Sequence, residues 1–349
     1  MSKMPSLPKA GIASLPTPLQ ELRNLSELLG GPRILVKRDD LTGLGMGGNK
    51  VRKLDYLMPS ILESKSDCIV TGAYFQSNWC TAVCAAGRKF GLDTILVKRA
   101  PPGYAPDVYE GNHLLQVLLG ARILTARGHE DEKVKEEVVQ TLIREGRRPY
   151  HISVGGNEPE GLAGYINAME ELARQSSDMG VKVDYVVHAT GSGGTQAGSI
   201  IGAKLYAKGT QVICSTSGSR SREQLTNLVT GFVEDALRFF KIDPQIGADD
   251  IHIYDNYAGT YGLVNEAKME AVKLLAETEG LIIDPVYTAS AVACLIDLCR
   301  KKFFRKDQTV VFVHTGGVAG LFPYHAPLKA FLSGQPFPWT VPPWHPSAV

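Results

Sequence analysis

The chain has 349 residues, of which 44% are hydrophobic and 21% charged, and its formal net charge at pH 7 is +1. Its length suits roughly two domains of about 150 residues each, and a nearly neutral chain without a Lys/Arg run is not expected to bind nucleic acid. No stretch reaches the roughly 18 apolar residues of a membrane span, and the Pro-rich N-terminus lacks the apolar centre of a signal peptide. We therefore expect a cytoplasmic protein that does not bind membranes.

Strand-like and helix-like runs alternate along the chain. Strands are predicted over residues 34–37, 68–71, 94–97, 122–124, 183–188, 211–216 and 309–314. Apolar residues recurring every three or four positions predict helices over residues 50–64, 78–90, 130–144, 158–175, 195–207, 222–240 and 264–278. Because parallel strands need crossover connections, this alternation predicts an α/β fold with mainly parallel sheets.

Two Gly-rich segments, residues 43–48 and 155–164, are candidate domain boundaries. The stretch between them holds about four strand–helix units, enough for a small open-sheet domain. We therefore expect a small domain over residues 51–162 and a large domain over residues 1–50 and 163–349. The Pro- and Trp-rich tail from Gln335 onward is expected to pack as an irregular extension or to meet a partner subunit.

The first Gly-rich loop leads directly to Lys50, at the start of a predicted helix. The helix dipole disfavours a lysine there, and a residue placed against local preference is often functional. The dipole and the nearby Arg52 would favour the neutral amine, which is the nucleophilic form. An ordinary surface lysine is the alternative that this loop alone leaves open.

The cysteines have no C-x-x-C spacing and no disulfide-framework density, so we expect buried free thiols at Cys68, Cys80, Cys84, Cys214, Cys294 and Cys299. Cys80 and Cys84 would share a helix face. No His or further Cys stands nearby to complete a metal site, and we expect no metal.

A second Gly-rich loop, residues 190–198, connects a predicted strand to a predicted helix. Glycines allow the backbone to approach a ligand, and the N–H groups at a helix start attract an anion. Ser192 and Thr195 add hydroxyl donors, so the loop is predicted to bind a phosphate. A P-loop would need Gly-Lys followed by Ser or Thr, and a dinucleotide fingerprint would need Gly in place of Gln196. A turn without a ligand is the remaining alternative.

A third Gly pair, Gly316-Gly317, follows the last predicted strand. In open α/β sheets ligands bind beyond the carboxyl ends of the strands. The hydroxyl of Thr315 is therefore placed to meet a ligand, unless the segment is a plain strand–helix turn.

Six ordered motifs together resemble those of the fold-type II pyridoxal-phosphate enzymes, in the branch of D-cysteine desulfhydrase and 1-aminocyclopropane-1-carboxylate (ACC) deaminase. They lie at residues 37–40 with 47–53, 76–78, 191–198, 257–259, 284–287 and 314–317. The resemblance extends from about Pro16 to Pro323. It implies two open, twisted, parallel-sheet domains of the tryptophan synthase β-like type, with pyridoxal 5′-phosphate in the cleft between them, and a homodimer.

The resemblance also implies which residues hold the cofactor. Lys50 would bind its aldehyde covalently, Asn78 would reach its ring oxygen, and the hydroxyl of Thr315 would be the partner of its pyridine nitrogen. Lys53 would help to bind the phosphate. The phosphate loop itself would consist of Gly191, Ser192, Gly193, Gly194 and Thr195.

For the substrate, the resemblance implies that Ser77 and Asn78 bind the carboxylate and that Lys50 moves protons at Cα. Tyr261 and Tyr287 would be active-site tyrosines. Tyrosine has a reference pKa of about 10, so a tyrosine base would need a lowered pKa, which close positive groups would supply.

Three positions set this chain apart within the branch. Thr288 stands where deaminase members carry a glutamate, which favours elimination of a β-substituent over ring opening. Trp79 replaces a smaller or hydrogen-bonding residue; it either narrows the substrate pocket or packs in the core. Glu158 and Glu160 lie near the expected cleft, or simply begin a helix, where acids are favoured.

The expected reaction is therefore β-elimination from a small cysteine-like amino acid, D-cysteine first, giving pyruvate, ammonia and a sulfur product. The alternatives are release of sulfite from L-cysteate, deamination of ACC, and a pseudo-enzyme that only binds pyridoxal phosphate. The presence of Lys50, Ser77, Tyr287 and Thr315 together argues against the pseudo-enzyme.

Overall fold

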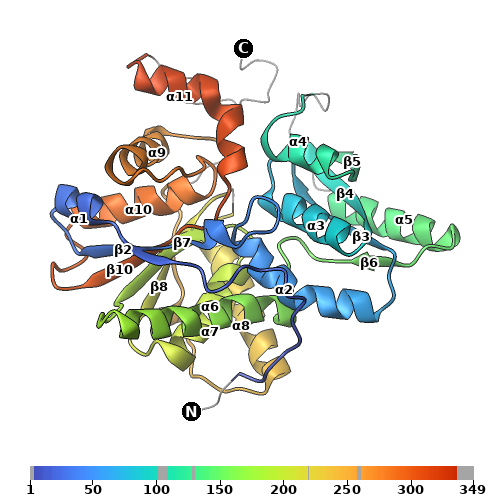
Figure 1. The fold of residues 1–349 in the computed structure, drawn as a ribbon, viewed down its shortest axis with the longest axis horizontal. Helices are drawn as coiled ribbons and strands as arrows, with labels where there is room; N and C mark the ends of the chain where they lie inside the picture. Colours follow the sequence, from blue (N-terminus) through green and yellow to red (C-terminus); the bar gives the residue numbers. More distant parts are fainter. Residues whose placement is uncertain (1–3, 101–107, 128–129, 219, 258–260, 336–349) are drawn as a thin grey trace.

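The chain folds into two lobes, each built on its own sheet (Figure 1). The computed structural model describes residues 4–100, 108–127, 130–218, 220–257 and 261–335. The large lobe holds a sheet in the order β1-β2-β10-β7-β8-β9, and the small lobe a sheet in the order β5-β4-β3-β6. Every neighbouring pair is parallel except β1 and β2. Two mainly parallel sheets confirm the predicted fold class.

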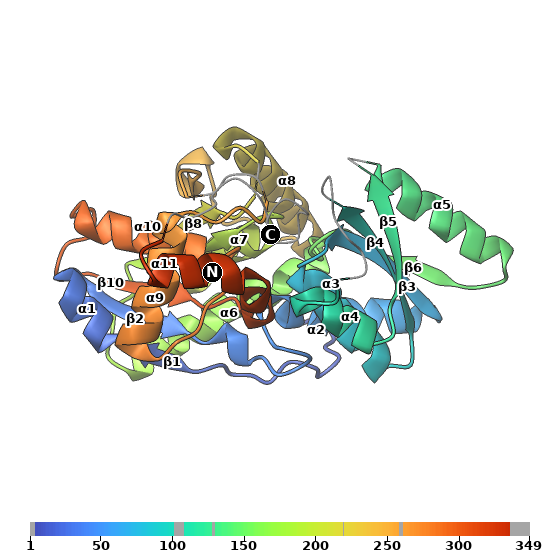
Figure 2. The same ribbon diagram turned by 90° about the horizontal axis from the view of Figure 1, so that it is seen from above.

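Helices cover both faces of the large sheet, as Figure 2 shows from above. Its strands are β1 Leu19–Glu21, β2 Arg33–Lys37, β7 Tyr185–Thr190, β8 Gln211–Thr216, β9 His252–Tyr254 and β10 Thr309–Val313. One face packs against α1 Arg23–Leu29, α9 Glu266–Glu279 and α10 Thr288–Arg300. The other packs against α6 Pro159–Asp178, α7 Gly194–Tyr206 and α8 Arg222–Phe240.

The central strands are apolar on both faces because both faces are covered. In β10, Val310 and Phe312 point into the core with α9 and α10, whereas Val311 and Val313 point into the core with α6 and α7. Successive side chains of a strand alternate between faces, so a strand between two helical layers needs an unbroken run such as Thr309–Val313.

The small lobe repeats this arrangement on a smaller scale. Its strands are β3 Cys68–Tyr74, β4 Asp93–Ala100, β5 Arg122–Arg127 and β6 Pro149–His151. Its helices are α2 Asn49–Glu63, α3 Asn78–Lys89, α4 Gly111–Leu118 and α5 Asp131–Arg144. Short 3-10 turns and a final helix complete the described chain: η1 Asp39–Leu41, η2 Ala248–Asp250, η3 Val318–Tyr324 and α11 His325–Leu332.

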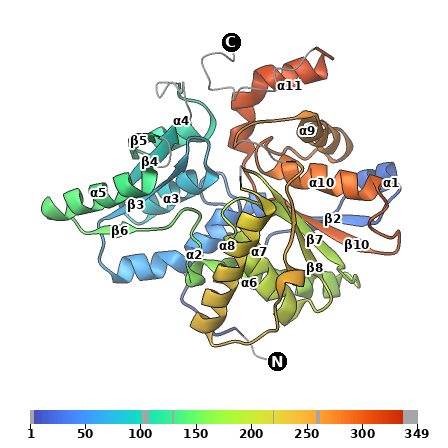
Figure 3. The ribbon, with the colours of Figure 1, turned by 180° about the vertical axis from the view of Figure 1, so that it is seen from behind.

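Helix α2 joins the two lobes. It follows η1 of the large lobe and packs against both α6 and α3, and it lies between the lobes in the views of Figure 1 and Figure 3. Its first turn carries Lys50, Arg52 and Lys53. The sheet of the small lobe, residues 68–151, falls inside the range that we assigned to the small domain, and the exact boundaries stay a prediction.

The predicted helices and strands are largely present, and the differences have simple causes. Strands β1, β6 and β9 were missed because three residues are too short to show a period. Helices α1, α4 and α11 have only seven or eight residues and were missed for the same reason. Helix α10, most of whose residues are buried, was also missed. The tail after Gln335 lies outside the described residues.

All six cysteines are free and buried, as predicted. None of the helices in the described ranges combines the length and apolarity needed to cross a membrane.

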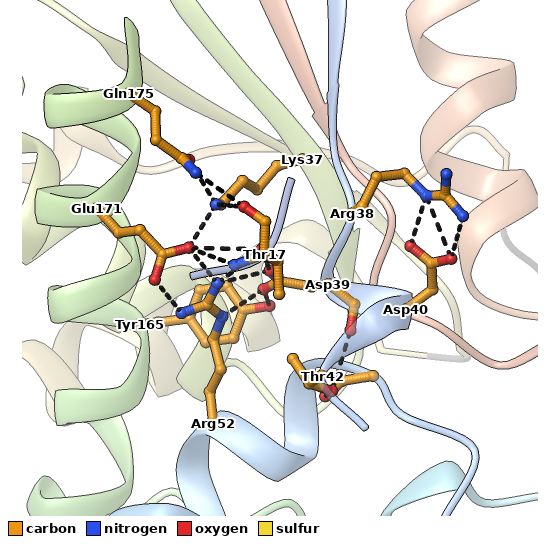
Figure 4. Close-up of polar contacts among 11 residues, drawn as sticks. Thr17, Lys37, Arg38, Asp39, Asp40, Thr42, Arg52, Tyr165, Glu171 and Gln175 are labelled. Atoms are coloured by element: carbon orange, nitrogen blue, oxygen red, sulfur yellow. Dashed lines mark hydrogen bonds and ion pairs between the residues drawn. The ribbon is translucent and has the colours of Figure 1, made fainter. Parts of the chain in front are cut away.

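A buried cluster of charges fastens the start of α2 to the large lobe (Figure 4). The Arg52 guanidinium donates to both oxygens of Asp39, each at 2.8 Å, and to both oxygens of Glu171, at 2.9 and 3.1 Å. The Lys37 ammonium also donates to Glu171, and the Thr17 hydroxyl donates to Asp39 at 2.8 Å. Burial alone would raise the pKa of the Asp39 carboxyl, but the paired Arg52 brings that pKa below its usual value. The two cations and two carboxylates therefore balance one another in the interior.

Arg52→Met should lower the free energy of unfolding by about 3–5 kcal/mol, because it leaves two buried carboxylates with one cation. The matched control is Arg305→Met, which removes an ion pair with Asp307 on the surface and should leave the free energy of unfolding nearly unchanged. Urea unfolding at pH 7 measures both. Equal, small losses from the two variants would show that Arg52 does not fasten α2.

Candidate active site

A cavity of about 420 Å³ lies where the strands of both sheets end. From the large sheet it is lined by residues that end or follow β7, β8 and β10, among them Thr190, Ser217 and Thr315. From the small sheet it is lined by residues that end or follow β3 and β4, such as Tyr74 and Arg99. The carboxyl ends of parallel strands are where open α/β sheets bind ligands.

Lys50 lines this cavity as the second residue of α2. Its side chain is half-buried, and within the described part of the chain no group forms a hydrogen bond or ion pair with its amine. Burial lowers its pKa to about 8. We expected Arg52 to favour the neutral amine, but Arg52 is already neutralised by Asp39 and Glu171. Loss of water around the amine, rather than a neighbouring cation, makes its neutral form accessible.

The loop before Lys50 packs directly on the segment after β10. The backbone N–H of Asn49 donates to the Thr315 carbonyl at 3.1 Å. Gly48 has a φ of +108°, and a Cβ added there would lie 2.8 Å from the same carbonyl oxygen. Thr315 itself lines the cavity, and its hydroxyl forms no hydrogen bond with any described residue. The amine and this hydroxyl therefore share one cavity.

The loop after β7 contacts the loop that carries Lys50. The Asn49 carboxamide donates to the Thr195 hydroxyl at 2.9 Å, which links the Lys50 loop to the start of α7. Gly193 caps α7 with a φ of +87°, a conformation that favours glycine. The Thr190 hydroxyl lines the cavity and, in the described ranges, is a buried polar group without a partner. A helix start with orphan N–H groups and a spare hydroxyl is the environment that an anion needs.

Lys53 lies behind this loop rather than in the cavity lining. Its amine donates to the Gly155 carbonyl at 2.8 Å and to the Asn157 side-chain oxygen at 2.7 Å. Asn157 in turn donates to the Ser192 carbonyl at 2.9 Å. Lys53 therefore supports the loop through Asn157. Sequence reasoning missed Asn157; its only signal was its place in a Gly-rich segment.

Among the other loop residues predicted to bind the cofactor, Gly191, Ser192, Gly193 and Thr195 line the cavity. Gly194 does not, because it faces the supporting side chains. A Cβ added at Gly194 would lie 2.1 Å from the Asn157 side-chain oxygen and 2.6 Å from the Lys53 amine.

Ser77 and Asn78 line the cavity at the start of α3. Ser77 is the N-cap, and its hydroxyl accepts the Cys80 N–H at 3.4 Å. The N–H groups of a helix's first turn have no partner within the helix, so this end of α3 is suited to an anion. The cavity thus contains two helix starts, α3 and α7, on opposite lobes.

Tyr261 and Tyr287 form a pair, with their hydroxyl oxygens 2.6 Å apart. Tyr74 stacks on Tyr261 with ring centroids 3.9 Å apart. The expected lowering of a tyrosine pKa is wrong: burial raises the pKa of both Tyr261 and Tyr287. At neutral pH these hydroxyls are therefore neutral hydrogen-bonding groups and not bases.

Trp79 serves the core more than the cavity. Only 2% of it is exposed, it belongs to the small-lobe core, and its N–H donates to the Thr71 hydroxyl at 3.0 Å. It also contributes to the cavity lining, and its effect on the width of the substrate pocket stays a prediction.

The structure places Thr288 outside the cavity lining. It is fully buried, and its hydroxyl donates to the Asp284 carboxylate at 2.5 Å. The Asp284 carboxylate also accepts the backbone N–H groups of Val286, Tyr287 and Thr288, so Asp284 satisfies the start of α10. Glu158 and Glu160 also begin a helix, α6, and Glu158 accepts the Ser153 N–H at 2.9 Å.

Two arginines that sequence reasoning missed line the cavity. Arg99, at the end of β4, donates to Asp131 at 2.6 Å and lies 5.5 Å from the centre of the Tyr74 ring. Arg220, after β8, donates to the Gly191 carbonyl at 2.8 Å. No motif marked them, because their position depends on how the two lobes face each other.

Comparison with known proteins identifies a family for this geometry. The model of the pyridoxal-phosphate dependent enzyme family matches residues 13–316. A putative ACC deaminase of Pyrococcus furiosus is 38% identical over 338 residues, which cover 95% of this chain and 98% of the relative. A D-cysteine desulfhydrase of Yersinia enterocolitica is 36% identical over 327 residues, covering 93% of this chain and 98% of the relative.

Solved structures of similar proteins have the same fold. An ACC deaminase homologue, 34% identical, superposes with a TM-score of 0.84 and covers 93% of this chain and 96% of its own. A threonine deaminase from tomato, Solanum lycopersicum, is 18% identical with a TM-score of 0.62, over 87% of this chain and 80% of its own, and shares the fold.

The cavity fits pyridoxal phosphate. Lys50 offers an amine with a lowered pKa, and the α7 loop offers a phosphate site with the unpaired Thr190 hydroxyl. Thr315, which follows β10 and lines the cavity, offers a hydroxyl that could bond a polar group on the cofactor ring. When bound, the cofactor withdraws electrons from the substrate Cα and so makes a bond to that carbon easier to break.

The attachment of pyridoxal phosphate to the apoprotein should quicken about tenfold per pH unit and level off above a pH of about 8, because only the neutral Lys50 amine attacks an aldehyde. Stopped-flow absorbance measures this rate. A rate that still rises toward pH 10 would show that the cavity does not lower the pKa of the reacting amine.

Gly194→Ala should weaken cofactor binding by at least about tenfold, because the new methyl group displaces the Asn157 and Lys53 side chains that hold the loop. Gly231→Ala is the matched control: it lies in α8 with nothing near its Cβ position. Equilibrium dialysis gives both dissociation constants. Equal affinities for the two variants would contradict a phosphate site at the start of α7.

Proposed function

We propose that this chain, which belongs to the family of pyridoxal-phosphate-dependent enzymes, is a carbon–sulfur lyase. Its cofactor is pyridoxal 5′-phosphate. The proposed reaction is β-elimination from a small cysteine-like amino acid, D-cysteine first, to give pyruvate, ammonia and a sulfur product. Relatives called D-cysteine desulfhydrase, at 36–37% identity, support the reaction class.

The observation that carries the proposal is one cavity that holds the Lys50 amine and two helix starts. The start of α7 is proposed to bind the cofactor phosphate, and the start of α3, with Ser77 and Asn78, the substrate carboxylate. An α-amino acid bound between them presents its Cα to Lys50. Lys50 is proposed to hold the cofactor first and then to move the proton at Cα.

The hydroxyls of Thr315, Tyr261 and Tyr287 are neutral, and we propose that they orient the cofactor and the substrate through hydrogen bonds. The Thr315 hydroxyl is proposed to bond the ring nitrogen, which a neutral hydroxyl does not fully protonate; this favours elimination over transamination. The Tyr261–Tyr287 pair stays neutral because burial raises both pKa values. We propose that these hydroxyls donate hydrogen bonds to the leaving group. The resemblance also supports a homodimer as the working assembly.

L-Cysteate is the second candidate substrate, with sulfite as the product. Its support is that Arg99 and Arg220 line the cavity, because a sulfonate favours arginine and hydroxyl donors. ACC deamination is the third candidate, supported by the names of relatives such as the one from Pyrococcus furiosus. Thr288 does not count against this reaction, because its side chain bonds Asp284 and lies outside the lining.

An assay of keto-acid release from D-cysteine, L-cysteine, L-cysteate and ACC tests the proposal. We expect pyruvate from D-cysteine, and no turnover in Lys50→Ala, because without the amine neither cofactor attachment nor proton movement at Cα is possible. Lys182→Ala, at an exposed ion pair with Asp184, is the control and should keep full activity.

The products separate the candidates. Sulfite with pyruvate from L-cysteate alone would replace D-cysteine as the substrate, and 2-oxobutyrate from ACC would make the chain a deaminase. No keto acid from any of the four, with pyridoxal phosphate bound, would sink the lyase proposal and favour a pseudo-enzyme.

A further inference from the structure

A chain of buried hydrogen bonds runs from Lys98 to Asn78, behind the start of α3. The Lys98 ammonium donates to the Gln116 side-chain oxygen, and the Gln116 amide donates to the Thr81 hydroxyl at 3.0 Å. The Thr81 hydroxyl donates to the Asn112 side-chain oxygen at 2.8 Å, and the Asn112 amide donates to the Asn78 side-chain oxygen at 2.7 Å. Apart from Asn78, at most 4% of any of these residues is exposed.

The direction of this chain follows from the chemistry of its ends. An ammonium only donates, so the Gln116 oxygen must face Lys98 and the Gln116 amide must face Thr81. Thr81 then uses its one hydroxyl proton toward Asn112, which turns the Asn112 amide toward Asn78. Burial lowers the pKa of Lys98 to about 8, so its charged form prevails at pH 7.

Backbone carbonyls enforce the same direction. The Gln116 amide also donates to the Ser77 carbonyl at 3.1 Å, and the Asn112 amide donates to the Gln76 carbonyl at 3.3 Å. The Lys98 ammonium donates to the Phe75 carbonyl at 2.8 Å. Three successive carbonyls of the loop before α3 are thus drawn away from the cavity. A carbonyl accepts only, so none of these amides can turn over without losing a buried hydrogen bond.

The consequence falls on Asn78, which lines the cavity. Its side-chain oxygen is occupied by Asn112, so its NH₂ group is the free end of the carboxamide. Within the described ranges no acceptor forms a hydrogen bond with that group. Its nitrogen lies 2.8 Å from the position of a Cβ added at Gly317, in the loop after β10. Asn78 therefore presents donors toward the loop that carries Thr315.

We propose that Asn112 is a positioning residue that makes Asn78 present its NH₂ group to the cavity, and that Lys98 sets the direction of the hydrogen-bond chain between them. This rests on the proposed role of Asn78 as a donor to the ring oxygen of pyridoxal phosphate. Neither Asn112 nor Lys98 contacts the cavity, since neither belongs to its lining.

Asn112→Asp tests the proposal, because the two side chains have the same shape but a carboxylate only accepts. Asn78 must then turn its NH₂ group toward residue 112 and its oxygen toward the cofactor. We expect the dissociation constant of pyridoxal phosphate at pH 7, where the Lys98 ammonium prevails, to rise about tenfold, the usual effect of one lost hydrogen bond to a charged group. The absorbance band of the bound cofactor should shift as well.

Two comparisons separate positioning from a general loss of structure. Asn167→Asp adds the same charge at a half-buried Asn of α6 that bonds Tyr56, outside the cavity lining, and should leave the dissociation constant unchanged. In an Asn78→Ala background, Asn112→Asp should not raise the dissociation constant further, because the Asn78 side chain through which residue 112 acts on the cofactor is absent. If Asn112→Asp does not fold, Asn112→Leu takes its place in the same cycle, with a smaller loss expected.

An unchanged dissociation constant in Asn112→Asp would overturn the proposal, and so would an equal loss with and without Asn78. Binding of pyridoxal phosphate needs no substrate. The absence of turnover with every amino acid tested would therefore sink the lyase proposal but leave this result intact.

Discussion

The close packing of the loop before Lys50 against the segment after β10 is the contact on which the site depends. A Cβ at Gly48 would lie 2.8 Å from the Thr315 carbonyl, and one at Gly316 would lie 2.7 Å from the Gly48 Cα, so only glycine permits this approach. The Asn49 side chain then ties the same loop to Thr195. In this way the start of α2 and the ends of β7 and β10 line one cavity, and Lys50 is part of that lining.

Three basic side chains at the start of α2 show how environment decides their roles. Arg52 is balanced by two carboxylates and fastens the helix. Lys53 bonds a carbonyl and Asn157, and supports the glycine loop. Lys50, in the described structure, has neither kind of partner, so burial acts on it alone and lowers its pKa to about 8. Basic side chains within one turn of each other thus become an anchor, a support for the loop and, as we propose for Lys50, the nucleophile.

The sequence predicts the fold class and the glycine loops well, because both depend on local patterns. It does not predict contacts between distant segments. The Arg99–Asp131 pair and the hydrogen-bond chain through Asn112 form only when the small lobe folds, and the Asn157–Ser192 contact forms only when the lobes meet. Two features could not be read from local patterns. Burial raises the pKa values of Tyr261 and Tyr287, whereas a tyrosine base would need a lowered pKa. The Thr288 hydroxyl bonds the Asp284 carboxylate, four residues before it, and Thr288 lies outside the cavity lining.

The most direct test of this account is to identify the lysine that holds the cofactor. Borohydride fixes the bond between a lysine and pyridoxal phosphate, and mass spectrometry of the digested protein then locates the label. The account predicts a single phosphopyridoxyl group on Lys50. The same group on another buried lysine with a lowered pKa, such as Lys53, Lys98 or Lys268, would contradict it.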